Sequence, residues 1–254
     1  MSKKIDILYI VGKGCSEWRN NELRYSLRSI EKYGQNVGKV FIAGFVPYWV
    51  DTNVVRAVPV KDETDNKHYN ILHAIEEAIR TGELSECFLY SSDDHYYTQP
   101  VDFAEYPIYW RGKSLPDTLP AKPRWYDITL KSTHDVLAAM SLPTHFFAWH
   151  GNTWFNTRIW RQQRMVLLRR LAQTMPEACD PTCLMLNYWQ AVEPQTMPKM
   201  IVRKDGKVTP ADTIAEVQRK AAAKEVISST DCAGMPLRTW LQSEFPHKSI
   251  YERD

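Results

Sequence analysis

The chain has 254 residues, of which 44% are hydrophobic and 24% charged, a composition that suits one globular domain or one domain with an elaborated C-terminal part. It has no apolar run of about 18 residues and no small-residue cleavage site near its start, so we expect a soluble protein without an export signal. The five scattered cysteines lack the spacing of a zinc site and fit reduced thiols in a cytoplasm.

Charge is unevenly divided along the chain. Residues 1–150 hold 17 Lys and Arg against 19 Asp and Glu, whereas residues 151–254 hold 15 against 11. The most basic stretch, Arg158–Arg170, contains five arginines and no acid. Its apolar residues share a helix face only in part, so these arginines form either a solvated face or a surface that contacts phosphate.

The first 92 residues alternate between short apolar runs and amphipathic segments. Apolar residues at helical spacing predict helices at 21–34 and 68–82, which end on Gly34 and Gly82 as C-caps. The alternation predicts a mostly parallel α/β sheet with helices on both faces. The runs that predict its strands are 5–11, 39–45, 53–60 and 86–92.

Beyond residue 100 the pattern changes. Residues 102–124 combine prolines and aromatic residues with little periodicity, which predicts loops. An aromatic segment, HFFAWHGNTWFN, occupies residues 145–156. The remaining apolar spacing predicts helices near 129–140, 158–170, 181–189 and 210–224.

Two polar motifs follow predicted strands at their carboxyl ends, where ligands bind in sheets of this kind. One is Gly12-Lys13, and the other is Asp93-Asp94-His95, in the stretch YSSDDHYYTQP. Adjacent carboxylates repel each other unless they are solvated, hydrogen-bonded or neutralised by a cation. The pair therefore predicts a divalent metal site, the alternative being two aspartates that cap a turn.

The segments DILYIVGKG, NNELRYSLRSIEKYG, VFIAG and FLYSSDDHYY, in this order, resemble the nucleotide-diphospho-sugar transferases of the GT-A fold. More narrowly, they are similar to compact bacterial and phage relatives of the Stealth sugar-phosphate transferases. The resemblance implies a GT-A-like, mostly parallel sheet flanked by helices, with a helical and loop-rich C-terminal part. Residues 1–112 would bind the donor, and residues 113–254 would form an acceptor-side elaboration of the same domain.

The resemblance also implies a reaction. A sugar would move from a nucleotide-diphosphate sugar, such as a UDP-sugar, to an acceptor hydroxyl, with Mn²⁺ or Mg²⁺ bridging the donor phosphates. Asp94 and His95 would bind the metal, and Asp93 would contact the donor ribose or sugar. A late histidine, His150 or in its place His145, would complete the metal site. The motif departs from the family pattern because its third position is not an aspartate.

Further roles are carried over onto matching positions. Arg24 would bind the donor pyrophosphate, the alternative being a surface arginine paired with Glu22 or Glu31. Asp127 would be the base of an inverting reaction, in a catalytic set with Asp93 and Asp94. The other candidate donor contacts are Val11, Gly12, Lys13, Asp62, Lys67 and Asn70.

The acceptor stays open between two chemistries. Phages encode transferases that place sugars on hydroxymethylated pyrimidines in DNA, and the arginine cluster favours DNA over a glycan or polyol phosphate. Stealth-like sugar-1-phosphate transfer is a further alternative, as is a non-catalytic nucleotide- or glycan-binding module. The residues expected to contact the acceptor are Trp149, Trp154, Arg158, Arg161 and Arg164.

Overall fold

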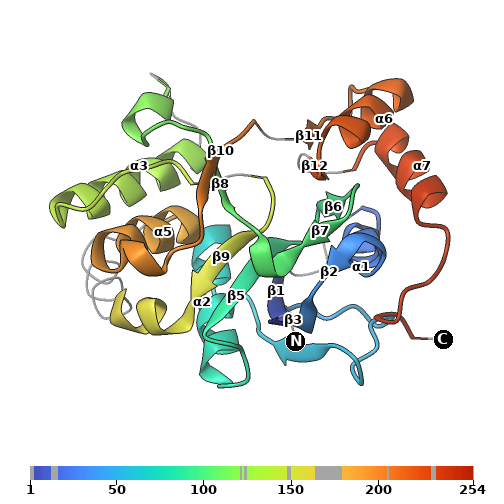
Figure 1. The fold of residues 1–254 in the computed structure, drawn as a ribbon, viewed down its shortest axis with the longest axis horizontal. Coiled ribbons are helices and arrows are strands. Elements are labelled where there is room, and N and C mark those ends of the chain that lie inside the picture. Colours follow the sequence, from blue (N-terminus) through green and yellow to red (C-terminus); the bar gives the residue numbers. More distant parts are fainter. Residues whose placement is uncertain are drawn as a thin grey trace.

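The computed structural model describes residues 3–12, 17–120, 122, 125–147, 150–163, 179–204, 206–229 and 233–253. Its centre is a five-stranded sheet in the order β4-β3-β1-β5-β9 (Figure 1). The first four strands in this order are parallel, and β9 joins β5 antiparallel. The prediction of a mostly parallel sheet is therefore confirmed. Its strands are β1 (Ile5–Val11), β3 (Val37–Gly44), β4 (Arg56–Pro59), β5 (Cys87–Ser92) and β9 (Thr153–Asn156).

Helices cover this sheet, and short strands extend the fold beyond it. Residues 157–163 are also helical. The helices are α1 (Asn21–Tyr33), α2 (Lys67–Arg80), α3 (Trp125–Ala139), α5 (Pro181–Val192), α6 (Ile214–Ala223) and α7 (Met235–Glu244). The short strands are β2 (Gly34–Gln35), β6 (His95–Tyr97), β7 (Val101–Asp102), β8 (Ile108–Trp110), β10 (Met200–Val202), β11 (Lys207–Val208) and β12 (Val226–Ser229).

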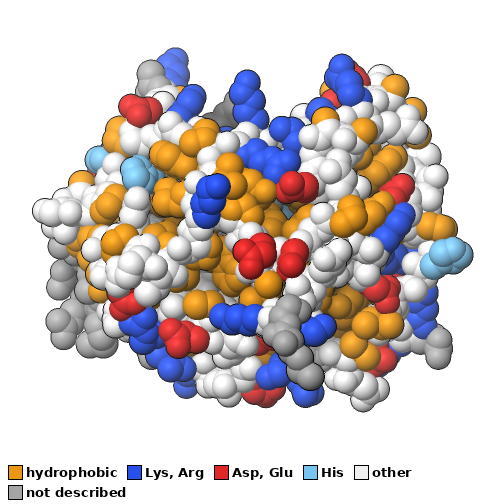
Figure 2. All heavy atoms as spheres, viewed as in Figure 1, with side chains coloured by type: hydrophobic (Ala, Val, Ile, Leu, Met, Phe, Trp, Pro, Cys, Tyr) orange, Lys and Arg blue, Asp and Glu red, His pale blue; other side chains and the backbone are white. Residues whose placement is uncertain are grey.

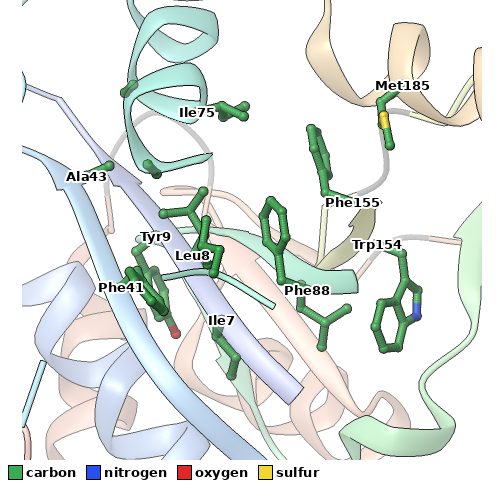
Figure 3. Close-up of a cluster of buried hydrophobic side chains, with 14 of the residues drawn as sticks. Ile7, Leu8, Tyr9, Phe41, Ala43, Ile75, Phe88, Trp154, Phe155 and Met185 are labelled. Carbon is green, nitrogen blue, oxygen red and sulfur yellow. The ribbon is translucent and has the colours of Figure 1, made fainter. Parts of the chain in front are cut away.

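The central strand β1 is apolar along most of its length because both of its faces are covered. In Figure 3, Leu8 points to the side of the sheet where Ile75 of α2 lies, whereas Ile7 and Tyr9 point to the opposite side. Tyr9 reaches α1 there, and its hydroxyl is 2.9 Å from the Ser26 hydroxyl. These residues are fully buried, which explains the continuous apolar run of this segment.

The C-terminal part of the chain completes the same core. Besides β9, it supplies β12, which pairs antiparallel with β6, and β10, which pairs with β8. Trp154, Trp189 and Met185 join β1 and β5 in one large hydrophobic cluster. A second cluster holds α6, α7 and β12 against Tyr25 of α1 and Tyr96 of β6. The N-terminal and C-terminal parts of the chain thus pack together in both clusters.

Several predicted boundaries are wrong, for local reasons. Gly34 is the C-cap of α1, as predicted, although its backbone there is extended (φ −80°) and opens β2 directly. Helix α6 begins at Ile214 rather than near residue 210, because Thr213 and Glu216 form a capping box there. Helix α3 begins at Trp125, before the predicted residue 129. Within the described part of the chain, no helix is long and apolar enough to cross a membrane.

Candidate functional site

The two adjacent aspartates form the tight turn between β5 and β6. Since β5 lies beside β1 in the parallel part of the sheet, Asp93 and Asp94 lie at its carboxyl edge, where ligands bind in such sheets. Both side chains are half-buried. The aspartates thus occupy the turn itself, and the metal site stays a prediction.

Strand β12 holds this turn from the side. The Ser229 amide donates to the Asp94 carbonyl at 3.4 Å, and the Ser229 hydroxyl donates to the Asp94 carboxylate at 3.3 Å. Ser228 is the strand partner of His95. A residue from near the C-terminus thus fixes the orientation of one carboxylate.

His95 lies beneath the carboxylates and is almost fully buried. Its Nδ1 accepts a long hydrogen bond from the Ser92 amide (3.4 Å), and its Nε2 is 3.9 Å from Asp94 Oδ1. Burial lowers the pKa of His95 to about 4, so the imidazole is neutral at neutral pH. A neutral imidazole with a nitrogen near Asp94 is compatible with metal ligation and does not compete with a cation.

A third acid adds to the negative charge at the turn. Glu22, in the first turn of α1, is buried, and its charge raises the pKa of both aspartates. The largest cause of both shifts is burial, and repulsion by Asp94 adds to that of Asp93. Lys67, the first residue of α2, opposes both shifts with its positive charge. The pKa values of both aspartates thus stay raised although Lys67 lies near enough to lower them.

Burial of Asp93, together with this repulsion, predicts how stability depends on pH. The pKa of Asp93 is raised in the folded protein, so the folded state binds a proton more tightly than the unfolded chain does. Its contribution is present below about pH 4, the ordinary range of aspartate, and is lost as the pH rises towards neutral. We expect Asp93→Asn to raise the melting temperature relative to wild type at pH 8 but not at pH 4. An equal difference at both values would contradict this account.

The serines of α1 explain part of the motif NELRYSLRSI. The Ser26 hydroxyl donates to the His95 carbonyl, and the Ser29 hydroxyl accepts from the Tyr97 amide at 2.9 Å. Both serines are fully buried. They attach α1 to the strand that follows the aspartate turn, which an ordinary amphipathic helix would not require.

The arginines of α1 bind the C-terminal segment. Arg28 forms a bidentate ion pair with Glu252, with N···O distances of 2.7 and 2.8 Å. Arg24 Nε is 3.1 Å from the same carboxylate, and its guanidinium lies 4.6 Å from the centre of the Trp49 ring. The acid that pairs with Arg24 is thus 228 positions away in the chain. The sequence analysis considered only the nearby acids Glu22 and Glu31 as partners, so it did not predict this pair. The role of Arg24 in donor binding stays a prediction.

The other expected donor contacts are spread around the same edge. Gly12 is exposed, and a Cβ built on it would meet no atom of the described residues within 4 Å, beside the buried Val11. Asp62 is exposed, and the Asn70 amide group holds residues 63–64 of the loop before α2 through both its oxygen and its nitrogen. Lys13 lies outside the described residues.

The later candidates lie on other elements. Asp127, in the first turn of α3, lines a cavity of about 380 Å³ together with Arg111 and Tyr126. His145 Nδ1 is 2.9 Å from Gln190 Oε1, while His150 is half-buried. Across the described ranges, no group of three or more His, Cys, Asp or Glu side chains is placed to hold a metal ion. The expected contribution of His150 to a metal site stays a prediction.

Of the expected acceptor residues, the structure describes Trp154, Arg158 and Arg161. Trp154 is 5% exposed, and its indole nitrogen donates to the Tyr106 carbonyl, so it packs in the core instead of facing an acceptor. Arg158 is ion-paired with Glu193 and Glu86. Arg161 is exposed. The remaining two, Trp149 and Arg164, lie outside the described residues.

Sequence reasoning missed two groups at the site. Glu22 was considered only as a partner for Arg24, although its place in the first turn of a helix at this edge could have indicated it. Ser229 carried no signal, since β12 is four residues long and unremarkable in sequence. A buried cluster beside the site, where His68 stacks on Tyr126 with ring centres 5.6 Å apart, also had no counterpart in the prediction.

Comparison with known proteins supports the resemblance for part of the chain. Residues 17–113 match the family model described as Stealth protein CR2, conserved region 2. The match contains α1, α2 and the Asp93-Asp94 turn, but not β9 or β12. This segment is Stealth-like.

Two curated relatives match over a similar length. The exopolysaccharide phosphotransferase CpsY of Mycobacterium leprae (strain TN) is 35% identical over 89 residues, which cover 32% of this chain and 16% of that protein. An exopolysaccharide phosphotransferase of Nocardia farcinica (strain IFM 10152) is 35% identical over 88 residues, 32% of this chain and 17% of the relative. The match thus spans about a sixth of these relatives.

A solved structure also aligns with the chain. It is a glycosyltransferase involved in the glycosylation of the major capsid of PBCV-1, with 12% identity and a TM-score of 0.42, and the alignment covers 94% of this chain and 99% of that one. At this identity and score, the likeness decides neither the fold family nor the substrate.

Proposed function

We propose that this protein transfers a sugar 1-phosphate from a nucleotide-diphosphate sugar to a hydroxyl group of a carbohydrate, on a GT-A-like scaffold. One observation carries the proposal. The mutually repelling carboxylates Asp93 and Asp94 lie at the carboxyl edge of a parallel sheet, close to the charge of Glu22 and within the segment that matches a Stealth conserved region. Such a set is suited to a cation that binds a diphosphate.

A divalent cation fits the residues present. Mg²⁺ is typically bound by one or two carboxylates together with substrate phosphates, and not by a cage made of protein alone. Asp93 and Asp94 can supply such oxygen ligands, and a cation between them would relieve the repulsion that, after burial, raises the pKa of Asp93. When bound, the cation would neutralise charge on the donor diphosphate. Mn²⁺, which also tolerates imidazole, would make His95 a ligand as well.

The surrounding residues suit a nucleotide donor. The open backbone at Gly12 lets a ligand approach the end of β1 closely. Lys67 brings positive charge to the aspartates from the start of α2, where it would also face donor phosphates. The Arg24 side chain is 26% exposed and already ion-paired, so it would share its guanidinium between Glu252 and a donor phosphate.

Two bond cleavages are chemically open, and they release different products. In sugar-1-phosphate transfer, the acceptor oxygen attacks the β-phosphorus, the bond from that phosphorus to the bridging oxygen breaks, and the nucleoside monophosphate leaves. In glycosyl transfer, the acceptor oxygen attacks the anomeric carbon, and the nucleoside diphosphate leaves. In both, the acceptor proton passes to a base, for which Asp127 stays the prediction. Both curated relatives are named exopolysaccharide phosphotransferases, which favours the first cleavage.

Slow hydrolysis of the donor distinguishes these reactions without knowledge of the acceptor. With water in place of the acceptor and Mg²⁺ or Mn²⁺ present, we expect UDP-sugars to give UMP and sugar 1-phosphate, detected by mass spectrometry. Release of UDP and free sugar would instead establish glycosyl transfer. No turnover with any common nucleotide sugar would favour a non-catalytic binding module. Asp94→Asn serves as the inactive control.

Transfer to phage-type DNA stays a second prediction. Its basis was the arginine cluster, but Arg158 is neutralised by two acids, and the tryptophan expected to stack on a base, Trp154, lies in the core. The described residues therefore give the DNA acceptor less support than the carbohydrate acceptor. Hydroxymethylated DNA belongs in the same donor assay as a competing acceptor, and efficient modification of it would reverse this preference.

A further inference from the structure

A cavity lies between the first half of α3 and the segment that follows β8, and we call it the α3 cavity. Its volume is about 380 Å³, within the usual range for ligand pockets. Its described lining comes from α3, from residues 111–118 and from Phe146. Figure 1 places α3 and the end of β8 on one side of the hollow that Figure 2 shows between the parts that carry α3 and α6. Since Lys113 and Asp117 are exposed, the cavity is open to the surface.

The charges along the described lining of the α3 cavity balance. Arg111 and Lys113 are positive, whereas Asp117 and Asp127 are negative. Hydrogen bonds from the Ser114 hydroxyl and amide lower the pKa of Asp117, so this acid is ionised at neutral pH. A ligand with a net charge would be attracted by one pair and repelled by the other. A neutral ligand with many hydroxyls can use both, because carboxylates accept from a hydroxyl while arginine and lysine donate to one.

The α3 cavity also has an apolar part. Leu130 and Phe146 are buried, and the Arg111 guanidinium lies 5.1 Å from the centre of the Phe146 ring. Tyr126 adds a second aromatic ring to the lining. Polar and apolar groups together suit a sugar, because its C–H groups pack against apolar side chains while its hydroxyls form hydrogen bonds. A bare phosphate or a hydrocarbon would use only one part of this lining.

The first turn of α2 lies beside both the α3 cavity and the aspartate turn. The Tyr126 ring stacks on the His68 ring, with the ring centres 5.6 Å apart. His68 follows Lys67, whose positive charge opposes the rise that burial causes in the pKa of Asp93 and of Asp94. The same helical turn therefore contacts the wall of the cavity and lies close to the carboxylates.

A buried acid makes a second connection between the two sites. Asp180, the N-cap residue of α5, is 6% exposed. Burial raises the pKa of Tyr126 and of Tyr90, and the negative charge of Asp180 adds to both shifts. Asp93 and Asp94 add further to the shift of Tyr90, which belongs to β5. Asp180 thus lies near both the cavity wall and the strand that leads to the aspartates, so the two sites are neighbours.

From these observations we infer that the α3 cavity binds a neutral sugar unit of the acceptor carbohydrate. This inference rests on the proposed function and specifies where its acceptor binds. The acids of the lining accept hydrogen bonds from the sugar hydroxyls, the basic side chains donate to them, and the apolar part packs against the ring. The reacting hydroxyl belongs to the same carbohydrate and lies at the neighbouring carboxylate site.

A binding experiment without donor tests the inference separately from the reaction. The probes are neutral oligosaccharides of glucose, galactose, mannose and N-acetylglucosamine, with an oligogalacturonate as the anionic comparison. Binding is observed by saturation-transfer NMR and titrated at low and high salt. We expect at least one neutral probe to bind more tightly than the anionic probe, with an affinity that does not change with salt.

Two variants of the lining should weaken this binding. Asp127→Ala removes a charged hydrogen-bond acceptor, so the affinity for the neutral probe should fall roughly tenfold. Thr118→Trp places a large side chain at a half-buried position of the lining and should abolish binding by filling the cavity. Because no donor is present, the predicted role of Asp127 as a base does not affect the result. The matched control Asp135→Ala removes the same charge from an exposed position of α3 and should bind like wild type.

Binding of no neutral probe, or equal binding by wild type and both lining variants, would overturn the inference. Tighter binding of the anionic probe, weakened by salt and by Thr118→Trp, would rule out the assignment to a neutral sugar. Cavity-dependent binding of a neutral probe without any donor turnover would instead refute the transferase and leave the sugar site in place. Circular dichroism and the melting temperature establish that each variant is folded.

Discussion

Replacing Asp94 by Asn should lower turnover of the nucleotide sugar by at least about a hundredfold, because charge stabilisation by a bound cation contributes several kcal/mol to such reactions. Asn keeps an oxygen that can accept from Ser229, which donates to Asp94 at 3.3 Å, so the turn should stay intact. Since the substitution also removes repulsion between adjacent carboxylates, the melting temperature at pH 8 should not fall. Turnover is measured as release of the nucleotide product.

The matched control for this variant is Asp135→Asn, which removes the same charge from an exposed position on α3. It should retain activity within a small factor of wild type. Full activity of Asp94→Asn, or full activity of wild type in excess EDTA, would contradict the metal site. A large loss of stability in Asp94→Asn would show that the turn, and not the cation, depends on this residue.

Replacing Glu252 by Gln should destabilise the protein by about 3 kcal/mol, the lower end of the cost of breaking a buried ion pair. The Glu252 side chain is only 5% exposed, and Arg28 binds both of its oxygens. Burial raises its pKa, but the hydrogen bonds from Arg28 and Ser249 outweigh burial and hold it below the ordinary value. The Ile250 amide also donates to Glu31, and the Arg253 amide donates to Trp49. Urea unfolding gives the free energy.

A control variant and a double variant test this prediction further. Glu83→Gln removes an acid from an exposed pair with Arg56, whose side chains are 54% exposed, and should cost under about 1 kcal/mol. Adding Arg28→Met to Glu252→Gln should cost less than the sum of the single effects, because the pair can be broken only once. Additive losses would show that Arg28 and Glu252 act independently.

The sequence predicted the structure best for strands that are buried on both faces. The run IDILYIV predicts a strand covered on both faces, and it forms β1 with the predicted bounds. The run that ends in Asp93-Asp94 likewise identified the carboxyl edge of β5, because a polar pair directly after a buried strand has few places to lie in a parallel sheet. Local periodicity was sufficient in both places.

Short elements could not be predicted in this way. Strand β6 is only three residues long, and its aromatic residues follow the aspartates without any alternation. Strand β9, inside the segment HFFAWHGNTWFN, is buried at all four positions, so no periodicity distinguishes it from other apolar sequence. The burial of Trp154 could not be predicted either, because a run of aromatic residues has the same sequence pattern whether it faces a ligand or the core.

By itself, the sequence determined the buried strands, the helices that follow them and the place of the carboxylate pair, because each follows from the pattern of residues close in the chain. Tertiary structure alone decided that Glu22 joins the aspartates, that Ser229 orients Asp94, and that Glu252 binds Arg28 from 224 positions away. It also paired β8 with β10 and β6 with β12, strands that lie far apart in the chain. The physical reason is that ion pairs and strand pairing are selected by distance in space, on which sequence separation places no constraint.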